Sequence, residues 1–147
     1  MIPKPILYNN MKSIRAIITS RHGTWQKFLQ NDVGSYQFVN VVAVANGSLT
    51  TIQMVKQHQP DMLLVDSSIP AEETNAILNN IKRETPSVLI VVIADTYQLQ
   101  RSFNKAGADY VVSTYEFKSK IQEIFNKYRE TYQNATGSME EASGTNL

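Results

Sequence analysis

The feature that most constrains the fold is a short apolar run that ends on an acidic residue. Residues 62–65 are Met-Leu-Leu-Val, and Asp66, two serines, an isoleucine and Pro70 follow directly. Four consecutive apolar residues fit a parallel strand that is covered on both faces. Asp66 would then stand at the carboxyl end of that strand, which is the edge where open α/β sheets place their sites. We therefore expect a parallel sheet with Asp66 at its functional edge.

Four further β-rich segments alternate with segments of helical periodicity. The strands are expected at 14–19, 38–45, 88–93 and 110–112, and the last helix is expected to run from 117 to about Tyr132. Strands that are each followed by a helix over short connections predict a parallel sheet with helices on both faces. At this length the sequence favours a flavodoxin-like (βα)5 fold of class α/β, with strand order 2-1-3-4-5.

Two terminal segments differ in composition from this unit. Residues 1–12 contain two prolines and an apolar Ile-Leu-Tyr triplet, which predicts an N-terminal arm. Residues 134–147 hold mostly Gly, Ser, Thr, Asn and Glu, so we expect a disordered tail. Residues 13–133 are then the single folded domain. No helix-turn-helix or other output domain fits into the tail.

Composition excludes several classes of function. The chain of 147 residues has no cysteine, which rules out disulfides, thiolate metal sites and a cysteine nucleophile. Its formal net charge of +1 gives little attraction to nucleic acid or to a membrane surface. No apolar run approaches the ~20 residues that span a bilayer. These features favour a cytoplasmic protein.

Short fragments spaced along the chain resemble a known family. They are the acceptor-like segment 66–70, the turn at 46–47, the approach to the third strand at 59–61 and the turn at 106–109. In this order they resemble the receiver domains of response regulators in two-component signalling, over about residues 14–132. The resemblance implies the (βα)5 fold and places Asp66 at the phosphoacceptor position.

The resemblance also implies parts of a pocket that this sequence lacks. Receivers hold Mg²⁺ with two acids after the first strand, and use a hydroxyl after the fourth and a lysine after the fifth. These groups neutralise the charge of phosphoryl transfer to a carboxylate. Here the acid pair falls on Ser20 and Arg21, the hydroxyl position on Ala94, and the lysine position on Ser113 or Thr114. We therefore expect a degenerate pocket with no metal site and no cofactor.

Arg21 is the sharpest departure from the pattern. A permanent cation repels a divalent metal and could instead form a bidentate pair with Asp66. The alternative is that Arg21 faces solvent from a loop. Asp66 has two interpretations as well, because it either accepts phosphate or caps the turn that follows it. The surrounding hydroxyls predict a polar cleft without a catalytic triad, and they belong to Thr19, Ser20, Ser67 and Ser68.

Aromatic and polar residues near the end of the chain suggest a partner surface. Tyr110 matches the aromatic position that often changes place in the receiver switch. The face made by the fourth helix and fifth strand would present Tyr97, Arg101, Lys105 and Tyr115. Tyrosines and uncharged polar groups suit protein contacts, although an ordinary solvated surface has the same composition.

Three functions remain open. The first is an atypical pseudo-receiver that acts as a phosphorylation-independent protein-interaction module, without enzymatic activity. Its partner would be a histidine kinase, a transcription factor or a second copy in a homodimer, with no direct nucleic-acid or membrane binding. The second is a receiver phosphorylated on Asp66 by a histidine kinase. The third is a flavodoxin-like enzyme or small-ligand binder.

Overall fold

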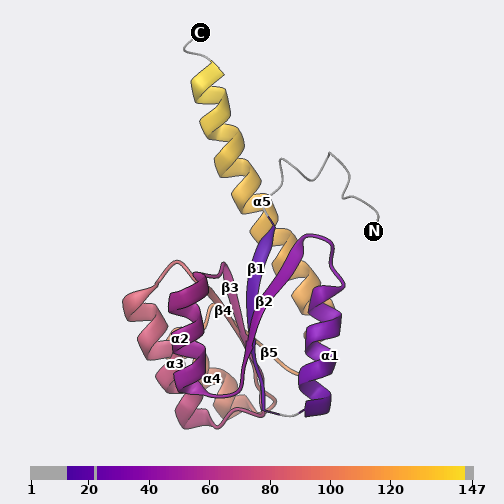
Figure 1. The fold of residues 1–147 in the computed structure, drawn as a ribbon, viewed down its shortest axis with the longest axis vertical. Coiled ribbons are helices and arrows are strands. Elements are labelled where there is room, and N and C mark those ends of the chain that lie inside the picture. Colours follow the sequence, from indigo (N-terminus) through magenta and orange to yellow (C-terminus); the bar gives the residue numbers. More distant parts are fainter. Residues whose placement is uncertain (1–12, 22, 145–147) are drawn as a thin grey trace.

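The computed structural model describes residues 13–21 and 23–144, which form one α/β domain (Figure 1). The strands are β1 (Ile14–Thr19), β2 (Val39–Ala45), β3 (Met62–Val65), β4 (Leu89–Ile93) and β5 (Tyr110–Val112). The helices are α1 (Gly23–Gly34), α2 (Ser48–His58), α3 (Ala71–Glu84), α4 (Tyr97–Ala106) and α5 (Phe117–Gly144). The five strands are parallel and lie in the order β2-β1-β3-β4-β5. The predicted flavodoxin-like fold is confirmed.

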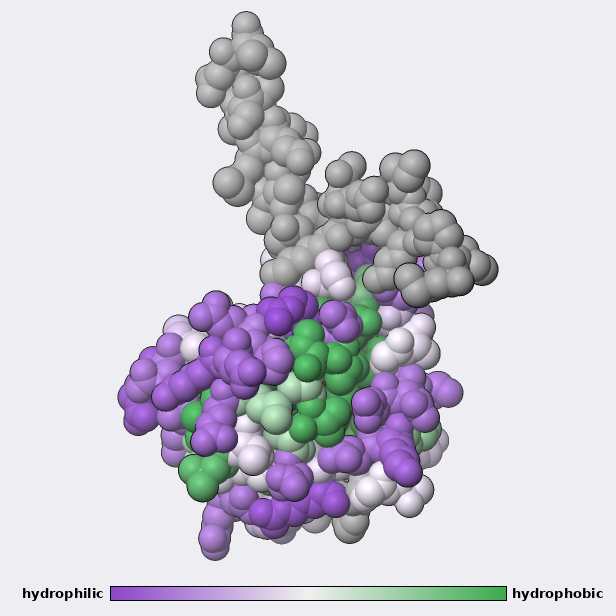
Figure 2. Space-filling view, in the orientation of Figure 1, coloured by the Kyte–Doolittle hydropathy of each residue, from purple (hydrophilic) through white to green (hydrophobic). Residues whose placement is uncertain are grey.

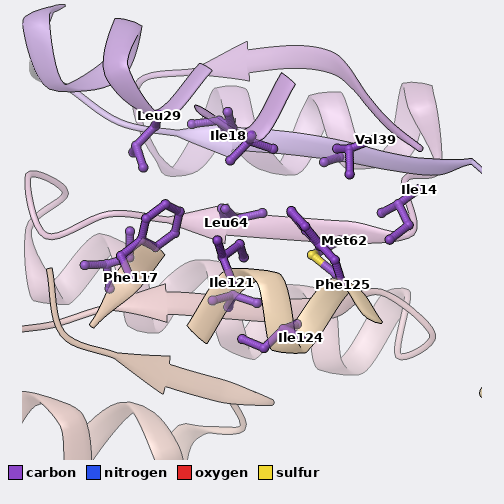
Figure 3. Close-up of a cluster of buried hydrophobic side chains, with 14 of the residues drawn as sticks. Ile14, Ile18, Leu29, Val39, Met62, Leu64, Phe117, Ile121, Ile124 and Phe125 are labelled. Atoms are coloured by element: carbon purple, nitrogen blue, oxygen red, sulfur yellow. The ribbon is translucent and has the colours of Figure 1, made fainter. Parts of the chain in front are cut away.

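Each face of the sheet buries its own apolar cluster. On one face Ile18, Met62 and Leu64 pack against Leu29 of α1 and Phe125 of α5 (Figure 3). On the other face, alternate residues of the same strands pack against α2, α3 and α4. Successive side chains of a strand point to opposite faces, so an unbroken apolar run supplies both clusters. This geometry explains why all four residues of β3 are apolar, since its side chains are buried on both faces of the sheet.

Strand β3 is the centre of the sheet and carries Asp66 to its edge. All four residues of the strand have 0% exposed surface. The strand pairs with β1 on one side and with β4 on the other. Directly after the strand, the backbone N–H of Asp66 donates to the carbonyl oxygen of Thr19, at 3.0 Å. This bond fixes Asp66 beside the end of β1, at the edge predicted from sequence.

Strand β2 lies at the edge of the sheet and is irregular. Its register with β1 shifts between Ala16 and Ile17, so Val42 is an extra residue that has no partner on β1. Residues 41–44 of β2 are only partly buried. Figure 2 shows apolar surface at the centre of the face on which β2 lies in Figure 1. A bulge of this kind interrupts the ladder and discourages another strand from pairing with the edge.

The last helix is longer than the sequence analysis expected. The backbone is helical to Gly144, where we had placed the end of the helix near Tyr132 and an unstructured tail after it. Residues 133–144 contain no proline, and extending an existing helix costs much less than starting one. The expected N-terminal arm, 1–12, and residues 145–147 lie outside the described residues. Within the described part of the chain, no helix is long and apolar enough to cross a membrane.

Candidate functional site

Asp66 is a buried carboxylate whose two oxygens are both hydrogen-bonded by neutral groups. Its exposed fraction is 2%. The hydroxyl of Ser20 donates to Oδ2 at 2.6 Å. The backbone N–H of Ser68 donates to Oδ1 at 2.9 Å, and the Ser68 hydroxyl donates to the same oxygen. Asp66 therefore caps the turn after β3, as one of the two sequence interpretations proposed.

The two serines are themselves held in place by the neighbouring loops. The backbone N–H of Arg21 donates to the Ser68 hydroxyl oxygen at 2.7 Å. The side chain of Gln26 on α1 donates to the Ser20 carbonyl at 2.7 Å. Of the hydroxyls predicted to line the cleft, Thr19 faces away and pairs with Thr51 of α2, with 2.7 Å between the two oxygens. The site thus joins the β1–α1 and β3–α3 loops through serine hydroxyls.

The proposed Arg21–Asp66 ion pair is wrong. The Arg21 guanidinium donates to Glu73 of α3 at 2.5 Å and to the Asn46 carbonyl at 2.9 Å. Its side chain is 45% exposed, so the pair lies at the surface. Glu73 was missed because it lies 52 positions from Arg21 and belongs to no receiver motif. An ion pair with this partly exposed carboxylate avoids the desolvation that pairing with buried Asp66 would require.

Glu73 connects three segments at this edge of the sheet. It accepts from the backbone N–H of Ser48, at 3.1 Å, and from the Ser48 hydroxyl, at 3.3 Å, at the start of α2. The Ser48 backbone bond lowers the pKa of Glu73, and the nearby Arg21 guanidinium lowers it further. A Cβ on Gly47 would lie 3.3 Å from Glu73 Oε1, so a larger residue here would require the carboxylate to shift by a few tenths of an ångström.

The remaining predicted pocket residues lie on neighbouring strand ends. Ala94, with 1% exposed surface, follows β4 and brings no hydroxyl. Thr114 donates from its N–H and its hydroxyl to Asp95, at 2.7 and 2.8 Å. Ser113 exchanges hydrogen bonds with Glu116, at 3.0 and 3.1 Å. Neither position that aligns with the receiver lysine bonds to Asp66, and Asp95 is a second partner that sequence reasoning missed.

A cavity of about 160 Å³ adjoins Asp66. Its lining includes Asp66, Ser67 and Ser68 on the β3 side, with Ala94 and Phe103 on the β4–α4 side. The small side chain at position 94 leaves this space open. Polar groups line the cavity on the β3 side only in part, because Ile69 and Pro70 also border it there, and its β4–α4 side is apolar.

The donor set around Asp66 does not fit the Mg²⁺ that the receiver resemblance implies. A hard divalent cation prefers several carboxylate oxygens. Where receivers have two acids, this chain has a buried hydroxyl and an arginine that is paired elsewhere. Within residues 13–21 and 23–131, no group of three or more His, Cys, Asp or Glu residues could hold a metal ion.

The expected switch and partner residues lie away from Asp66. Tyr110 of β5 is partly buried against the cluster beneath α5. Tyr97 and Tyr115 are 71% and 97% exposed, and Arg101 and Lys105 are also exposed on α4. These residues form a solvent-facing surface, and its role in binding a partner stays a prediction.

Comparison with known proteins points to one kind of domain. No protein-family model matches the chain. The probable C4-dicarboxylate response regulator DctR of Priestia megaterium is 24% identical over 92 residues, or 60% of this chain and 40% of that protein. The transcriptional regulatory protein CitT of Bacillus subtilis is 26% identical over 93 residues, or 61% of this chain and 41% of its own length. The chain thus spans less than half the length of these relatives.

Solved structures give the same answer. The signal receiver domain of NarL from Mycobacterium tuberculosis matches with a TM-score of 0.71 and 16% identity, covering 81% of this chain and 98% of NarL's receiver. The chain has the fold of a response-regulator receiver domain. The isolated receiver domain of RcsB from Salmonella enterica, solved with a beryllofluoride phosphomimetic, also matches, with a TM-score of 0.68 and 18% identity over 79% of this chain and 90% of that one.

These likenesses correct one expectation about partners. From the formal net charge of +1 we had expected no direct nucleic-acid binding. RcsB, however, was solved in complex with DNA, with a TM-score of 0.72 and 17% identity over 82% of this chain and 62% of RcsB. CitT is named as a transcriptional regulator. The net charge was counted over this chain alone. It therefore carries no information on the parts of RcsB and CitT that the chain does not match.

Proposed function

We propose that this receiver domain transmits a signal through protein contacts without being phosphorylated on Asp66 and without catalysis of its own. The observation that carries the proposal is the hydrogen bonding of Asp66. Both of its oxygens accept bonds from neutral donors, and the carboxylate has 2% exposed surface. The cytoplasmic setting expected from composition is part of this proposal.

Phosphoryl transfer to this carboxylate would meet two obstacles. The attacking oxygen already accepts a serine hydroxyl, as Oδ1 and Oδ2 both do, and this hydrogen bond lowers its nucleophilicity. The incoming group also brings negative charge that a metal and a cation would normally neutralise. Arg21 is the cation nearest in sequence to Ser20, and it is already paired with Glu73. The pocket is therefore suited to one fixed state.

Phosphorylation on Asp66 is the second candidate. Asp66 directly follows the central strand, beside the end of β1. The similar receiver of RcsB was solved with a phosphomimetic. These two observations support a phosphoacceptor role as the alternative. The first experiment therefore asks whether a phosphomimetic binds at Asp66.

The test is a titration with Mg²⁺ and beryllofluoride. Binding is monitored through the amide NMR spectra of the wild type and of Asp66→Ala. We expect no saturable change at Asp66, Ala94 or β5 in the wild type, because the described residues bring neither a metal-binding acid pair nor an unpaired cation to Asp66. A Ser20→Asp, Arg21→Asp variant is the positive control, since it restores the acid pair and should gain Mg²⁺ affinity. Saturable wild-type shifts that disappear in Asp66→Ala would instead establish the phosphoacceptor function.

A further inference from the structure

Asp66 is a buried carboxylate whose side-chain hydrogen bonds within the described part of the chain come from neutral donors. Its three hydrogen bonds come from two hydroxyls and one backbone N–H, all of them neutral. Among the described residues, no ion pair to Asp66 is formed, and Arg21 pairs with Glu73 instead. Burying a carboxylate without an opposite charge is costly even when it is hydrogen-bonded. A cation brought by a ligand would relieve that cost.

The cavity beside Asp66 has a shape and chemistry that restrict such a ligand. Its volume is about 160 Å³, and Asp66 is the one ionisable group among its described lining residues. Cavities of roughly 150 Å³ hold a molecule about the size of benzene. The ligand should therefore have few non-hydrogen atoms and one positive charge.

The β4–α4 side of the cavity favours hydrocarbon. Ile93, Ala94 and Phe103 line it and are exposed by 1%, 1% and 4%. A hydrated metal ion would gain nothing from these side chains, whereas a short alkyl chain would bury apolar surface against them. Thr74 and Ser68 also line the cavity, and their hydroxyl oxygens are able to accept from a charged donor.

We propose that this cavity binds a primary alkylammonium group, with its nitrogen at Asp66 and its hydrocarbon against Ile93, Ala94 and Phe103. The ammonium has three N–H donors, which suits one carboxylate oxygen and nearby hydroxyls. The start of α3 at Ala71 also borders the cavity, and its partial positive charge opposes the ligand. The full charge of Asp66 outweighs that half charge. The inference does not depend on whether Asp66 accepts phosphate.

The test is an NMR titration of the full chain with n-butylammonium chloride, at ionic strength matched with NaCl. We expect saturable shifts at Asp66, Ile93 and Ala94. The uncharged analogue n-butanol should bind about tenfold more weakly or worse, because it lacks the charge-assisted hydrogen bond. Equal binding of the two ligands, or no saturation with butylammonium at tens of millimolar, would overturn the proposal.

Two variants test separately the contribution of the Asp66 charge and that of the cavity volume to binding. Asp66→Asn keeps the size of the side chain and removes the charge, and Ala94→Ile fills the cavity and leaves the charge. Both should lose butylammonium binding, while Ser87→Ala, at an exposed position outside the cavity, should bind like the wild type. Circular dichroism confirms that each variant is folded, and the butanol comparison stays decisive if one is not. Undiminished binding by Asp66→Asn would contradict the proposal.

A lysine side chain of another protein offers the same ammonium and alkyl chain as a free amine. Nα-acetyl-lysine methylamide distinguishes the two sources, because its peptide groups must remain at the mouth of the cavity. Binding tighter than that of butylammonium would identify a partner's lysine as the ligand. Binding of butylammonium alone would identify a free small amine. Both results support the ammonium site, and failure of both ligands excludes it.

Discussion

At the residue scale, two serines determine the state of Asp66. Ser20 has 0% exposed surface and gives its hydroxyl to Oδ2, and Ser68 bonds to Oδ1 through its backbone and its side chain. Hydroxyls are neutral donors, so they stabilise the charge without cancelling it. Arg21, which could have cancelled the charge, is held by Glu73 and by the Asn46 carbonyl. Both oxygens of Asp66 are therefore hydrogen-bonded, but its negative charge is not cancelled by these partners.

Ser20→Ala tests this arrangement directly. Removing the hydroxyl leaves Oδ2 of a buried carboxylate without its 2.6 Å bond. We expect the free energy of unfolding to fall by about 1–3 kcal/mol. Urea denaturation measures the change. The matched control is Ser87→Ala, because Ser87 is exposed, and this substitution should stay within about 0.5 kcal/mol of the wild type. A Ser20→Ala variant as stable as that control would show that the bond contributes little.

At the element scale, Glu73 ties the start of α2 to α3. Its carboxylate accepts from the N–H and the hydroxyl of Ser48, the first residue of α2, and pairs with Arg21 of the β1–α1 loop. A carboxylate at a helix N-terminus satisfies an otherwise unpaired N–H and interacts favourably with the helix dipole. The three segments are thereby held together at this edge of the sheet.

The contact between Glu73 and Ser48 should weaken at low pH, when the Glu73 carboxylate is protonated. The Ser48 backbone bond lowers the pKa of Glu73, so the contact is present above the ordinary glutamate value. It should be lost as the pH falls through the lowered pKa of the folded state. The amide shift of Ser48, followed by NMR against pH, should titrate with a midpoint below that of an ordinary glutamate, and Glu73→Gln should abolish the transition. A midpoint at or above the ordinary value would contradict the contact.

At the scale of the whole molecule, the sheet stands between two apolar clusters that different helices cover. Helix α5 covers one of them alongside α1, and its Phe125 has 0% exposed surface. The Phe125 ring meets Tyr36 edge-on, with 5.1 Å between centroids, and Phe38 at 6.1 Å. This aromatic group joins the loop between α1 and β2 to α5. The stability of the domain therefore depends on α5 as well as on the sheet.

Phe125→Ala measures that dependence. Removing the ring leaves a cavity between α5 and the sheet, and we expect a loss of about 3–5 kcal/mol in the free energy of unfolding. The comparison variant is Tyr115→Ala, since Tyr115 is 97% exposed and its ring should contribute less than about 0.5 kcal/mol. Guanidinium denaturation of both variants measures the two losses in the free energy of unfolding. Similar losses in the two would mean that α5 packs loosely.

Local patterns in the sequence determined the strands, the strand order and the place of Asp66. The ranges 14–19 and 110–112 match β1 and β5, because apolar runs of this kind have few other ways to be buried. Only the tertiary structure decided that Arg21 pairs with Glu73 and that Ser20 and Ser68 meet at Asp66. These contacts join residues 52, 46 and two positions apart, and a side chain's choice among several partners depends on loop geometry and on the cost of desolvation. The bulge at Val42 and the length of α5 were likewise set by packing and helix extension, which no local pattern records.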